Sequence, residues 1–286
     1  FVTSEAAAEG VITGYGTVDG RLVYAYAQDF NTLGGAYGVK NAEKISNILD
    51  MAAKMGAPVV SILDSNGAKI EEGIDALAGL GKLFAKNASL SGVVPLISMV
   101  LGPCAGGAVY TPSMSDFVFM VDKISNMYMT GPAVTSGVTG ENVDAESLGG
   151  AEVCAENGIA SFVFDNEDLC FNEVRRLISF LPSNNIEISP ITVPSDDMNR
   201  LSEQLNTIIP DNGEGFDILN IIREIADNGD VLEVSPEYAK NMVTALARLN
   251  GSTVGIVANQ SISDNGDIDI NAANKAAKFI SICDSF

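Results

Sequence analysis

Two glycine-rich segments hold the residues of this sequence whose types and spacing could do chemistry. The first comprises residues 64–73 (DSNGAKIEEG) and the second residues 102–108 (GPCAGGA), and each follows an apolar run that is typical of a buried strand. Where a strand turns into a helix through glycines, backbone N–H groups lack intrahelical acceptors and can bind an anion. Two such turns that face each other could stabilise an oxyanion. We predict that the backbone N–H groups of Ala68, Gly106 and Gly107 are the donors.

An alternative explanation exists for each turn taken alone. Close packing of a helix against a strand also selects glycine and alanine, because a larger side chain would keep the two backbones apart. Ligands, however, bind at the carboxyl ends of parallel strands, and the two turns follow successive strands. The pairing of the turns therefore favours a site over packing.

Several catalytic arrangements are excluded by the residues that are missing. The chain contains no histidine, so a Ser-His-Asp triad is impossible. It has neither a Walker loop nor a GxSxG motif. No pair of the four cysteines has metal-ligand spacing, and we expect no metal. The chemistry is expected to rest on backbone donors and on a group that the substrate or a cofactor brings.

Some side chains in the turns have two possible roles. Cys104 could be a thiol nucleophile, but no histidine is present to activate it, and a small packing residue is the alternative. Asp64, Glu71 and Glu72 could supply an acid–base pair, or they could cap a helix and interact with its dipole.

The composition is that of an acidic, folded chain. It has 286 residues, of which 47% are hydrophobic and 19% charged, and this predicts one large or two ordinary domains. The net charge of −21 argues against a nucleic-acid partner. An anionic ligand would need a local basic patch, for which Lys69, Lys82 and Lys86 are the candidates nearest the turns. No stretch approaches eighteen apolar residues, so we expect no membrane insertion, and reduced cysteines favour a cytoplasmic location.

Alternating strands and helices must position the turns. Asp19-Gly20 predicts a hairpin between strands at 11–18 and 22–27. A helix at 41–55 carries an apolar stripe of Ala42, Ile45, Leu49 and Ala52, and a helix at 73–91 one of Ile74, Leu77, Gly81, Phe84 and Ala88. Further strands are expected at 59–63, 93–100, 117–121, 126–129 and 159–164, and further helices at 108–114, 145–156 and 169–181. This alternation predicts a mainly parallel sheet in an α/β arrangement.

The chain also contains a weak internal repeat. Residues 182–198 have the composition of a linker and lead into an expected helix at 197–208, so we predict domains at 1–190 and 191–286. A shift of 231 residues places Asp19-Gly20 on Asn250-Gly251 and predicts a tandem duplication. The second copy of the first turn would begin at residue 295. We therefore expect an incomplete second domain and a fragment of a longer protein.

The residues of both turns resemble a known family. Residues 62–73 (ILDSNGAKIEEG) resemble a signature of the carboxyltransferase subunits of biotin-dependent acyl-CoA carboxylases, of the propionyl-CoA carboxylase β or methylmalonyl-CoA carboxyltransferase type, and residues 102–110 (GPCAGGAVY) match that family directly. Other matches are QDF at 28–30, LGG at 33–35, TGP at 130–132, LGGA at 148–151, LPSNN at 181–185, GIVAN at 255–259 and AAKFI at 276–280. The resemblance covers nearly the whole chain.

This resemblance implies a ClpP/crotonase-like α/β fold in tandem copies. It implies that the N-terminal domain holds a short-chain acyl-CoA, and that Ala68 and Gly106/Gly107 stabilise the thioester enolate while CO2 moves between carboxybiotin and the α-carbon. Biotin would arrive on a carrier domain of a partner, with biotin carboxyl carrier and biotin carboxylase subunits as partners. A homo-oligomer is expected, either a dimer or a hexamer formed as a trimer of dimers. The implied substrate-binding residues are Gly34, Gly35, Gly67 and Lys69.

The sequence departs from the family pattern within the first turn. Asn66 stands in place of a glycine, and Lys69 and Glu71 stand in place of Arg and Gln. A phosphate contact by Lys69 would be a point charge rather than a fork. Because the second oxyanion hole is missing, we expect no turnover by this chain alone.

Three other functions stay open. The chain could belong to a biotin-dependent acyl-CoA decarboxylase of the sodium-pump type, in which the same chemistry runs in reverse. It could be a crotonase-type hydratase or isomerase, which would need Glu71 or Glu72 as acid–base. It could also be a non-catalytic acyl-CoA-binding fragment.

Overall fold

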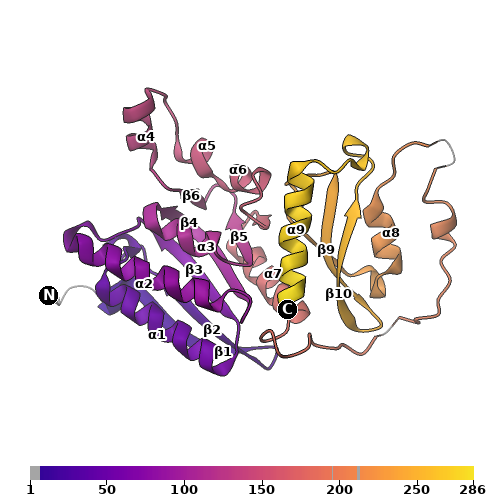
Figure 1. The fold of residues 1–286 in the computed structure, drawn as a ribbon, viewed down its shortest axis with the longest axis horizontal. Helices are drawn as coiled ribbons and strands as arrows, with labels where there is room; N and C mark the ends of the chain where they lie inside the picture. The colour runs from indigo at the N-terminus through magenta and orange to yellow at the C-terminus, as the bar shows by residue number, and fades with distance from the viewer. Residues whose placement is uncertain (1–6, 195, 211–212) are drawn as a thin grey trace. The chain divides into compact units, whose positions relative to one another are not determined.

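The computed structural model describes residues 7–194, 196–210 and 213–286. The chain divides into two compact units, drawn in indigo to magenta and in orange to yellow (Figure 1). Unit 1 comprises Phe1–Arg175 and Ser183–Ile186, and unit 2 comprises Arg176–Pro182 and Glu187–Phe286.

Unit 1 is built on a seven-stranded sheet of order β1-β2-β3-β4-β5-β7, with β6 paired to β4. The hairpin of β1 and β2 is antiparallel and closes at Val18 and Arg21, around the predicted Asp19-Gly20 turn. The other pairs are parallel, which confirms the predicted mainly parallel sheet. The strands are β1 (Val11–Val18), β2 (Arg21–Gln28), β3 (Val59–Ser65), β4 (Leu96–Ala105), β5 (Phe117–Val121), β6 (Asn126–Tyr128) and β7 (Phe162–Phe164).

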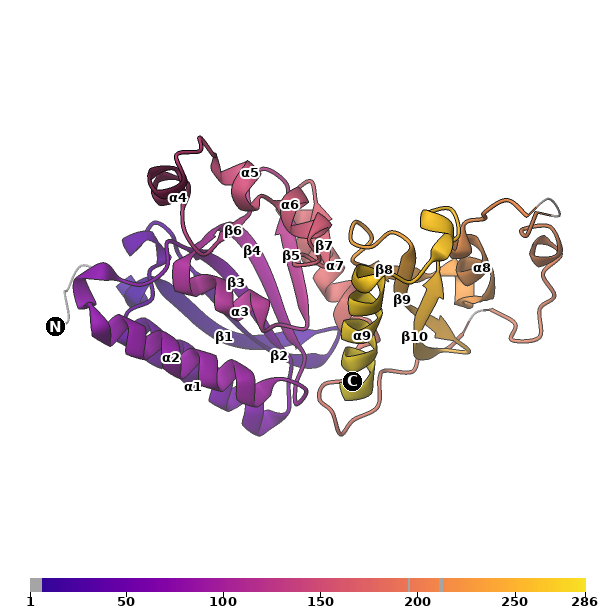
Figure 2. The same cartoon turned by 45° about the horizontal axis from the view of Figure 1, so that its top comes forward.

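Two long helices run side by side along unit 1, α1 (Val39–Met55) and α2 (Ile74–Leu90) (Figures 1 and 2). Helix α1 is buried along the predicted stripe of Ala42, Ile45, Leu49 and Ala52. A glycine in the left-handed conformation, Gly56, ends α1, as expected for a residue without a side chain. The predicted helix and its buried face are therefore confirmed, with the helix beginning at Val39, two residues before the predicted start.

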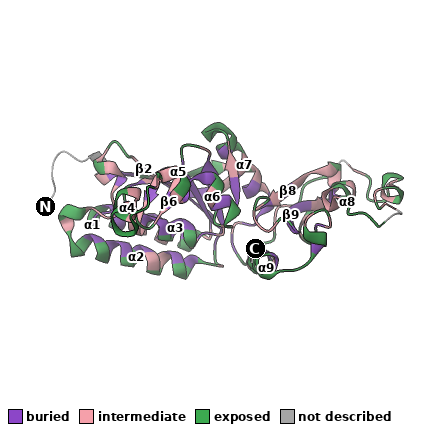
Figure 3. Ribbon diagram, turned by 90° about the horizontal axis from the view of Figure 1, so that it is seen from above, coloured by how far each residue is buried: buried purple, intermediate pink, exposed green. Residues whose placement is uncertain are grey.

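The predicted buried face of α2 is wrong. Ile74 and Leu77 are 79% and 59% exposed, whereas Leu80 and Leu83 are 4% and 1% exposed. Figure 3 shows the resulting alternation of exposed and buried surface along this helix. The sequence offers two neighbouring apolar arcs, and periodicity cannot choose between them because each fits a 3.6-residue repeat.

The predicted helix at 145–156 is two helices. Asp144 caps α5 (Ala145–Gly149) through a 2.7 Å bond from the Ser147 N–H, and extended backbone at Gly150 separates it from α6 (Ala151–Glu156). A Cβ on Gly150 would lie 2.3 Å from the Glu146 carboxylate. The remaining elements of unit 1 are η1 (Ala7–Gly10), η2 (Leu33–Gly35), η3 (Ile70–Glu72), η4 (Gly106–Val109), α3 (Tyr110–Ser113), α4 (Pro132–Thr139) and the beginning of α7 (Glu167–Phe180).

Unit 2 contains an antiparallel sheet of order β10-β9-β8. Its elements are η5 (Gln204–Asn206), α8 (Ile218–Ile225), η6 (Asp227–Gly229), β8 (Val231–Val234), β9 (Met242–Leu249), β10 (Ser252–Asn259), η7 (Asp264–Gly266) and α9 (Ile270–Ser285). The helix predicted at 197–208 is wrong, because only the short turn η5 forms there. The Asp197 carboxylate instead accepts a 2.9 Å bond from the Asn199 N–H, a local contact that competes with helix formation.

The duplication is confirmed element by element. Strands β9 and β10, turn η7 and the first residue of α9 lie 231 positions after β1, β2, η2 and the first residue of α1. Backbone bonds repeat as well: the Asp29 N–H donates to the Gly10 carbonyl at 2.9 Å, and the Gln260 N–H donates to the Asn241 carbonyl at 2.9 Å. Both units therefore contain the same hairpin–turn–helix module.

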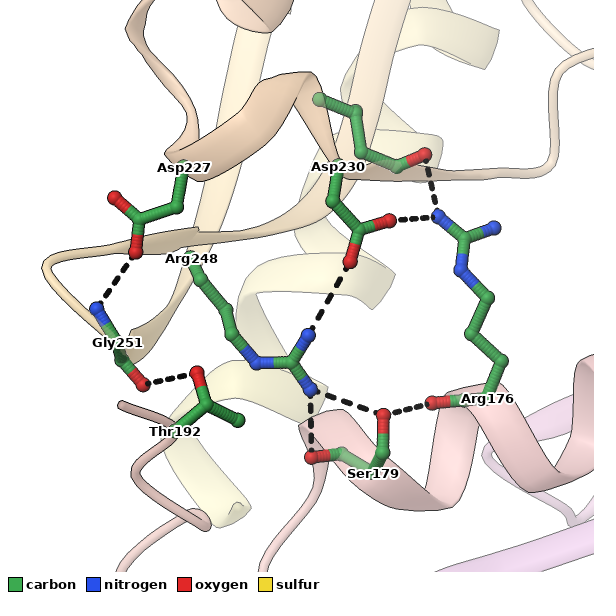
Figure 4. Close-up of polar contacts among 8 residues, drawn as sticks. Arg176, Ser179, Thr192, Asp227, Asp230, Arg248 and Gly251 are labelled. Carbon is green, nitrogen blue, oxygen red and sulfur yellow. Dashed lines mark hydrogen bonds and ion pairs between the residues drawn. The ribbon is translucent and has the colours of Figure 1, made fainter. Parts of the chain in front are cut away.

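The last turn of α7 is held within unit 2 by Arg248 of β9 (Figure 4). The Arg248 guanidinium lies 4.0 Å from the centroid of the Phe180 ring and donates to the Ser179 carbonyl at 3.0 Å. It also pairs with Asp230, which accepts a second bond, at 2.5 Å, from Arg176. A planar, stacked arginine between a ring and a carboxylate fixes the helix end in one orientation.

Candidate functional site

The sheet brings the two glycine turns to one edge. Strands β3 and β4 are parallel neighbours, and their ladder extends to the pair Ser65 and Cys104. The turns touch beyond this pair, because a Cβ on Gly67 would lie only 2.8 Å from the Ala105 carbonyl oxygen. Gly67 also has a φ of +98°, which disfavours any other residue. The structure thus joins the segments that the sequence singled out.

In the first turn, the Ala68 N–H points away from the neighbouring segment that contains Tyr37. Ala68 forms a parallel bridge with Tyr37, whose N–H donates to the Gly67 carbonyl at 2.8 Å and whose carbonyl accepts from the Lys69 N–H at 2.9 Å. In such a bridge the groups of the flanking residues face the partner, so those of Ala68 point the other way. The neighbouring Gly67 N–H is bonded to Ser65 Oγ at 3.1 Å.

The second turn places Gly106 and Gly107 at the beginning of η4. Gly106 has a φ of +57°, and the atom nearest to its Cβ position is the Met129 carbonyl oxygen at 4.0 Å, so its surroundings are open. A Cβ on Gly107 would lie 2.7 Å from Leu80 Cδ1. The first N–H groups of this helical turn have no intrahelical acceptor and can donate to a ligand.

Gly34 and Gly35 lie beneath the first turn. The Gly34 carbonyl accepts from the Asn66 N–H at 3.0 Å, and a Cβ on Gly35 would lie 2.0 Å from the Asp64 carbonyl oxygen. These two glycines therefore contact the backbone of the first turn directly. Their contact with substrate, like the donor roles of Ala68, Gly106 and Gly107, stays a prediction.

Lys69 is held by carboxylates of its own chain. Its Nζ lies 2.8 Å from Glu72 Oε1 and 3.7 Å from Glu9 Oε2, and its side chain is 14% exposed. The hydrogen bond with Glu72 raises the pKa of Lys69 and lowers that of Glu72. Glu72 also accepts a 2.6 Å bond from the Val39 N–H at the first turn of α1. A phosphate at Lys69 would have to compete with these two carboxylates.

The side chains considered as nucleophile or acid–base differ in their environment. Cys104 is 0% exposed, and burial raises the pKa of its thiol, as expected of a packing residue. Burial, with smaller contributions from Asp29 and Glu167, raises the pKa of Asp64 to about 6. Glu72 serves the N-terminus of α1, the capping alternative for this residue.

The other two lysines of the expected basic patch lie on α2. Lys86 pairs with Asp50, while Lys82 lines a groove of about 540 Å³ between α1 and α2 together with Lys40, Glu43 and Asp75. Among the described residues, no group of three or more His, Cys, Asp or Glu could hold a metal ion. Nor does this part of the chain contain a helix with the length and apolar character needed to cross a bilayer.

Gln28 and Tyr37 support the site but were not predicted to do so. Tyr37 is 0% exposed and bridges to Ala68, and Gln28 is 7% exposed and bonds to both Gly35 and Asp64. Gln28 had two local signals: it is a polar residue after a run rich in apolar residues, and it begins the QDF match at 28–30. For Tyr37 the sequence holds no signal, because the bridge joins segments thirty residues apart.

The parallel sheet, its paired turns and the repeated hairpin–turn–helix module define a crotonase-like α/β protein. The chain belongs to the carboxyl transferase domain family, which it matches over residues 2–286. It is 51% identical over 284 residues to the methylmalonyl-CoA decarboxylase subunit alpha of Veillonella parvula, covering 99% of this chain and 56% of that protein. It is 49% identical to the propionyl-CoA carboxylase beta chain of Roseobacter denitrificans, covering 98% of this chain and 55% of that protein.

A solved structure has the same fold. The crystal structure of transcarboxylase 12S with hydrolysed methylmalonyl-coenzyme A bound, described as a hexamer assembly, matches with a TM-score of 0.96 and 46% identity over 99% of this chain and 55% of that chain. The chain thus spans about half the length of the relatives it matches.

Proposed function

We propose that unit 1 binds the acyl-CoA of a biotin-dependent carboxyltransferase and stabilises the thioester enolate with the amides of Ala68, Gly106 and Gly107. The observation that carries this proposal is the direction of the Ala68 N–H, which points away from its supporting loop while Gly67 touches the second turn. Donors fixed before the substrate arrives need no reorganisation when charge develops. Gly34, Gly35 and Gly67 would keep this geometry.

The remaining chemistry would come from outside the chain. Carboxybiotin on a partner carrier domain, when bound, supplies CO2 and a base for the α-proton. The part of this chain is to hold the thioester carbonyl so that negative charge gathers on its oxygen. A histidine-free chain suits this division, because no side-chain base is required. Lys69 would add a point charge for a phosphate once Glu72 releases it.

The substrate class that we propose is a short-chain acyl-CoA, such as propionyl-CoA or methylmalonyl-CoA. We propose as partners a biotin carboxyl carrier and a biotin carboxylase, together with further copies of this chain in a homo-oligomer, all in the cytoplasm. A decarboxylase subunit is the second candidate, since a decarboxylase subunit is among the relatives at 51% identity. Both directions of the reaction use the same enolate and the same amides.

The test is to remove the Ala68 N–H while keeping its side chain. Replacing Ala68 by lactic acid exchanges its N–H for an ester oxygen and also weakens the Gly67 carbonyl as the acceptor of the Tyr37 N–H. The wild-type alanine is the isosteric control, and Ala68→Ser is a second control that keeps the N–H. We measure methylmalonyl-CoA decarboxylation with free biotin in the full-length protein that carries this chain. The ester is expected to lower kcat about a hundredfold or more relative to Ala68→Ser.

Three results would contradict the proposal. Equal kcat for the ester and the serine variant would exclude Ala68 as a donor. Turnover without biotin would favour a hydratase or isomerase, whereas acyl-CoA binding without any turnover would favour a binding module.

A further inference from the structure

Gln28 connects the first turn to the loop beneath it. It is the last residue of β2, and its side chain is 7% exposed. Its Nε2 donates to the Gly35 carbonyl at 3.1 Å, and its Oε1 accepts from the Asp64 N–H at 3.3 Å. One amide side chain therefore joins the segment before α1 to the segment that leads to Ala68.

The bond to Asp64 extends the sheet beyond the end of its backbone ladder. The last backbone pair of β2 and β3 is Ala27 and Ile62, yet β3 continues to Ser65. The Asp64 N–H lies past this pair, and the side chain of Gln28 supplies the acceptor that β2 no longer provides. Buried N–H groups need such a partner, because leaving one unpaired is unfavourable.

The contacts of Gln28 lead to Ala68 through a short chain of bonds. Gly35 follows Gly34, whose carbonyl accepts from the Asn66 N–H. It also lies two residues before Tyr37, which bonds to the backbone of the two residues that flank Ala68. Asp64 lies four residues before Ala68 and is the second-last residue of β3. By joining Gly35 to Asp64, Gln28 ties together the two segments that form the Tyr37–Ala68 bridge.

The second module repeats this contact independently. Residue 259 is the counterpart of residue 28 at the 231-residue shift, and Asn259 donates through its side-chain amide to the carbonyl of Gly266, the counterpart of Gly35. A shorter amide thus makes the same donor contact to the same turn. The recurrence of this bond in two places argues that the turn requires it.

We propose that Gln28 is a positioning residue that orients the Ala68 amide for oxyanion stabilisation. This inference rests on the proposed function for its catalytic consequence, but its structural part stands by itself. Gln28 touches no reacting atom. Its loss should lower kcat with little change in KM, because the substrate still binds while the donor is misdirected.

The test compares three variants of the full-length protein. Gln28→Met keeps the size of the side chain and removes both bonds. Gln28→Asn keeps an amide that can reach the Gly35 carbonyl, as Asn259 does in its own module, but falls short of the Asp64 N–H. Val94→Ala is the control for general destabilisation. Val94 is 0% exposed and precedes the N-terminal end of β4, whereas the two glycine turns follow the C-terminal ends of β3 and β4.

Two measurements decide the outcome. Hydrogen exchange of the amides of Asp64 and Lys69, which donate to Gln28 and Tyr37, should accelerate at least tenfold in Gln28→Met relative to Val94→Ala. The kcat should fall about tenfold to a hundredfold in Gln28→Met, with partial recovery in Gln28→Asn and a KM within about threefold of the wild type.

Failure of this inference can be told from failure of the proposed function. If the wild-type protein turns over and Gln28→Met matches Val94→Ala in kcat and in exchange, the inference is wrong and the function stands. If the wild-type protein shows no biotin-dependent turnover, the proposed function fails, and exchange at Asp64 and Lys69 still decides whether Gln28 orients the turn.

Discussion

Two neighbouring glycines in η2 allow a measurement of how much the contact between η2 and the first turn contributes to the free energy of unfolding. Gly34 and Gly35 have φ values of +63° and +60°, so alanine at either position is strained by about 1–2 kcal/mol. Their surroundings differ. An alanine Cβ at 34 would meet the side-chain nitrogen of Asn66 at 2.6 Å, which can swing away, whereas at 35 it would meet the Asp64 backbone oxygen at 2.0 Å.

Gly35→Ala is therefore expected to destabilise unit 1 more than Gly34→Ala does. Relief of the overlap requires the backbone of the first turn to move by more than about 1 Å, and overpacking of this kind costs about 1–3 kcal/mol. The strain and the unfolded-state effect of Gly→Ala are common to both variants and cancel in the comparison. The expected difference in the free energy of unfolding is thus about 1–3 kcal/mol.

The assay is urea unfolding followed by tyrosine fluorescence, because six of the seven tyrosines belong to unit 1 and the chain has no tryptophan. Gly266→Ala is a second control. Gly266 is the counterpart of Gly35 and has a φ of +70°, but the atom nearest to its Cβ position is Asn259 Cβ at 3.2 Å. Equal midpoints for Gly35→Ala and Gly34→Ala would refute the view that η2 carries the first turn.

Three further outcomes are expected. Arg248→Lys should lower the stability of unit 2 by about 1–3 kcal/mol in urea, because lysine cannot stack on Phe180 while donating to its neighbours, and a change below about 0.3 kcal/mol would contradict this. Burial raises the pKa of Asp64 to about 6 from an ordinary 3.8, so the folded state favours the protonated acid. Its stabilising contribution is full below about pH 4 and is lost as the pH rises through about 6. Asp64→Asn should accordingly raise Tm at pH 7.5 by more than at pH 4.5, and a constant difference would oppose this account. Maleimide should modify one thiol of the native chain, that of the exposed Cys283, and all four after unfolding, and rapid modification of a second native thiol would contradict the assigned burial.

Much of the fold could be predicted because its signals are local. Asp19-Gly20 predicts the hairpin, and the stripe of Ala42, Ile45 and Leu49 predicts the buried face of α1. The match of the chain to itself at a shift of 231 residues then transfers both predictions to unit 2. The face of α2 could not be predicted, since Ile74 and Leu77 fit the helical period as well as the buried residues do. Choosing between such arcs requires knowledge of what the helix packs against.

The site was predictable in its location but not in its support. Glycines after apolar runs mark both turns, and parallel strands bring them to one edge. The bridge between Tyr37 and Ala68 and the pairing of Lys69 with Glu72 depend on tertiary contacts, which no local pattern encodes. The sequence alone therefore predicts Lys69 as a substrate-binding residue and gives no sign of the carboxylates that pair with it.

The two modules also indicate which elements set the path of turn η2. Turn η2 has φ values of +57°, +63° and +60°, and η7 has +45°, +54° and +70°, so both adopt the same left-handed path. Yet Tyr37 is 0% exposed beneath the first turn, whereas its counterpart Ile268 is 64% exposed. The path of η7 is thus the same as that of η2 although Ile268 is exposed among the described residues. The elements that the two loops share are the hairpin before them and the helix after them, so we expect these elements to set the shape of the loop. A loop of fixed shape next to Ala68 suits a preorganised donor.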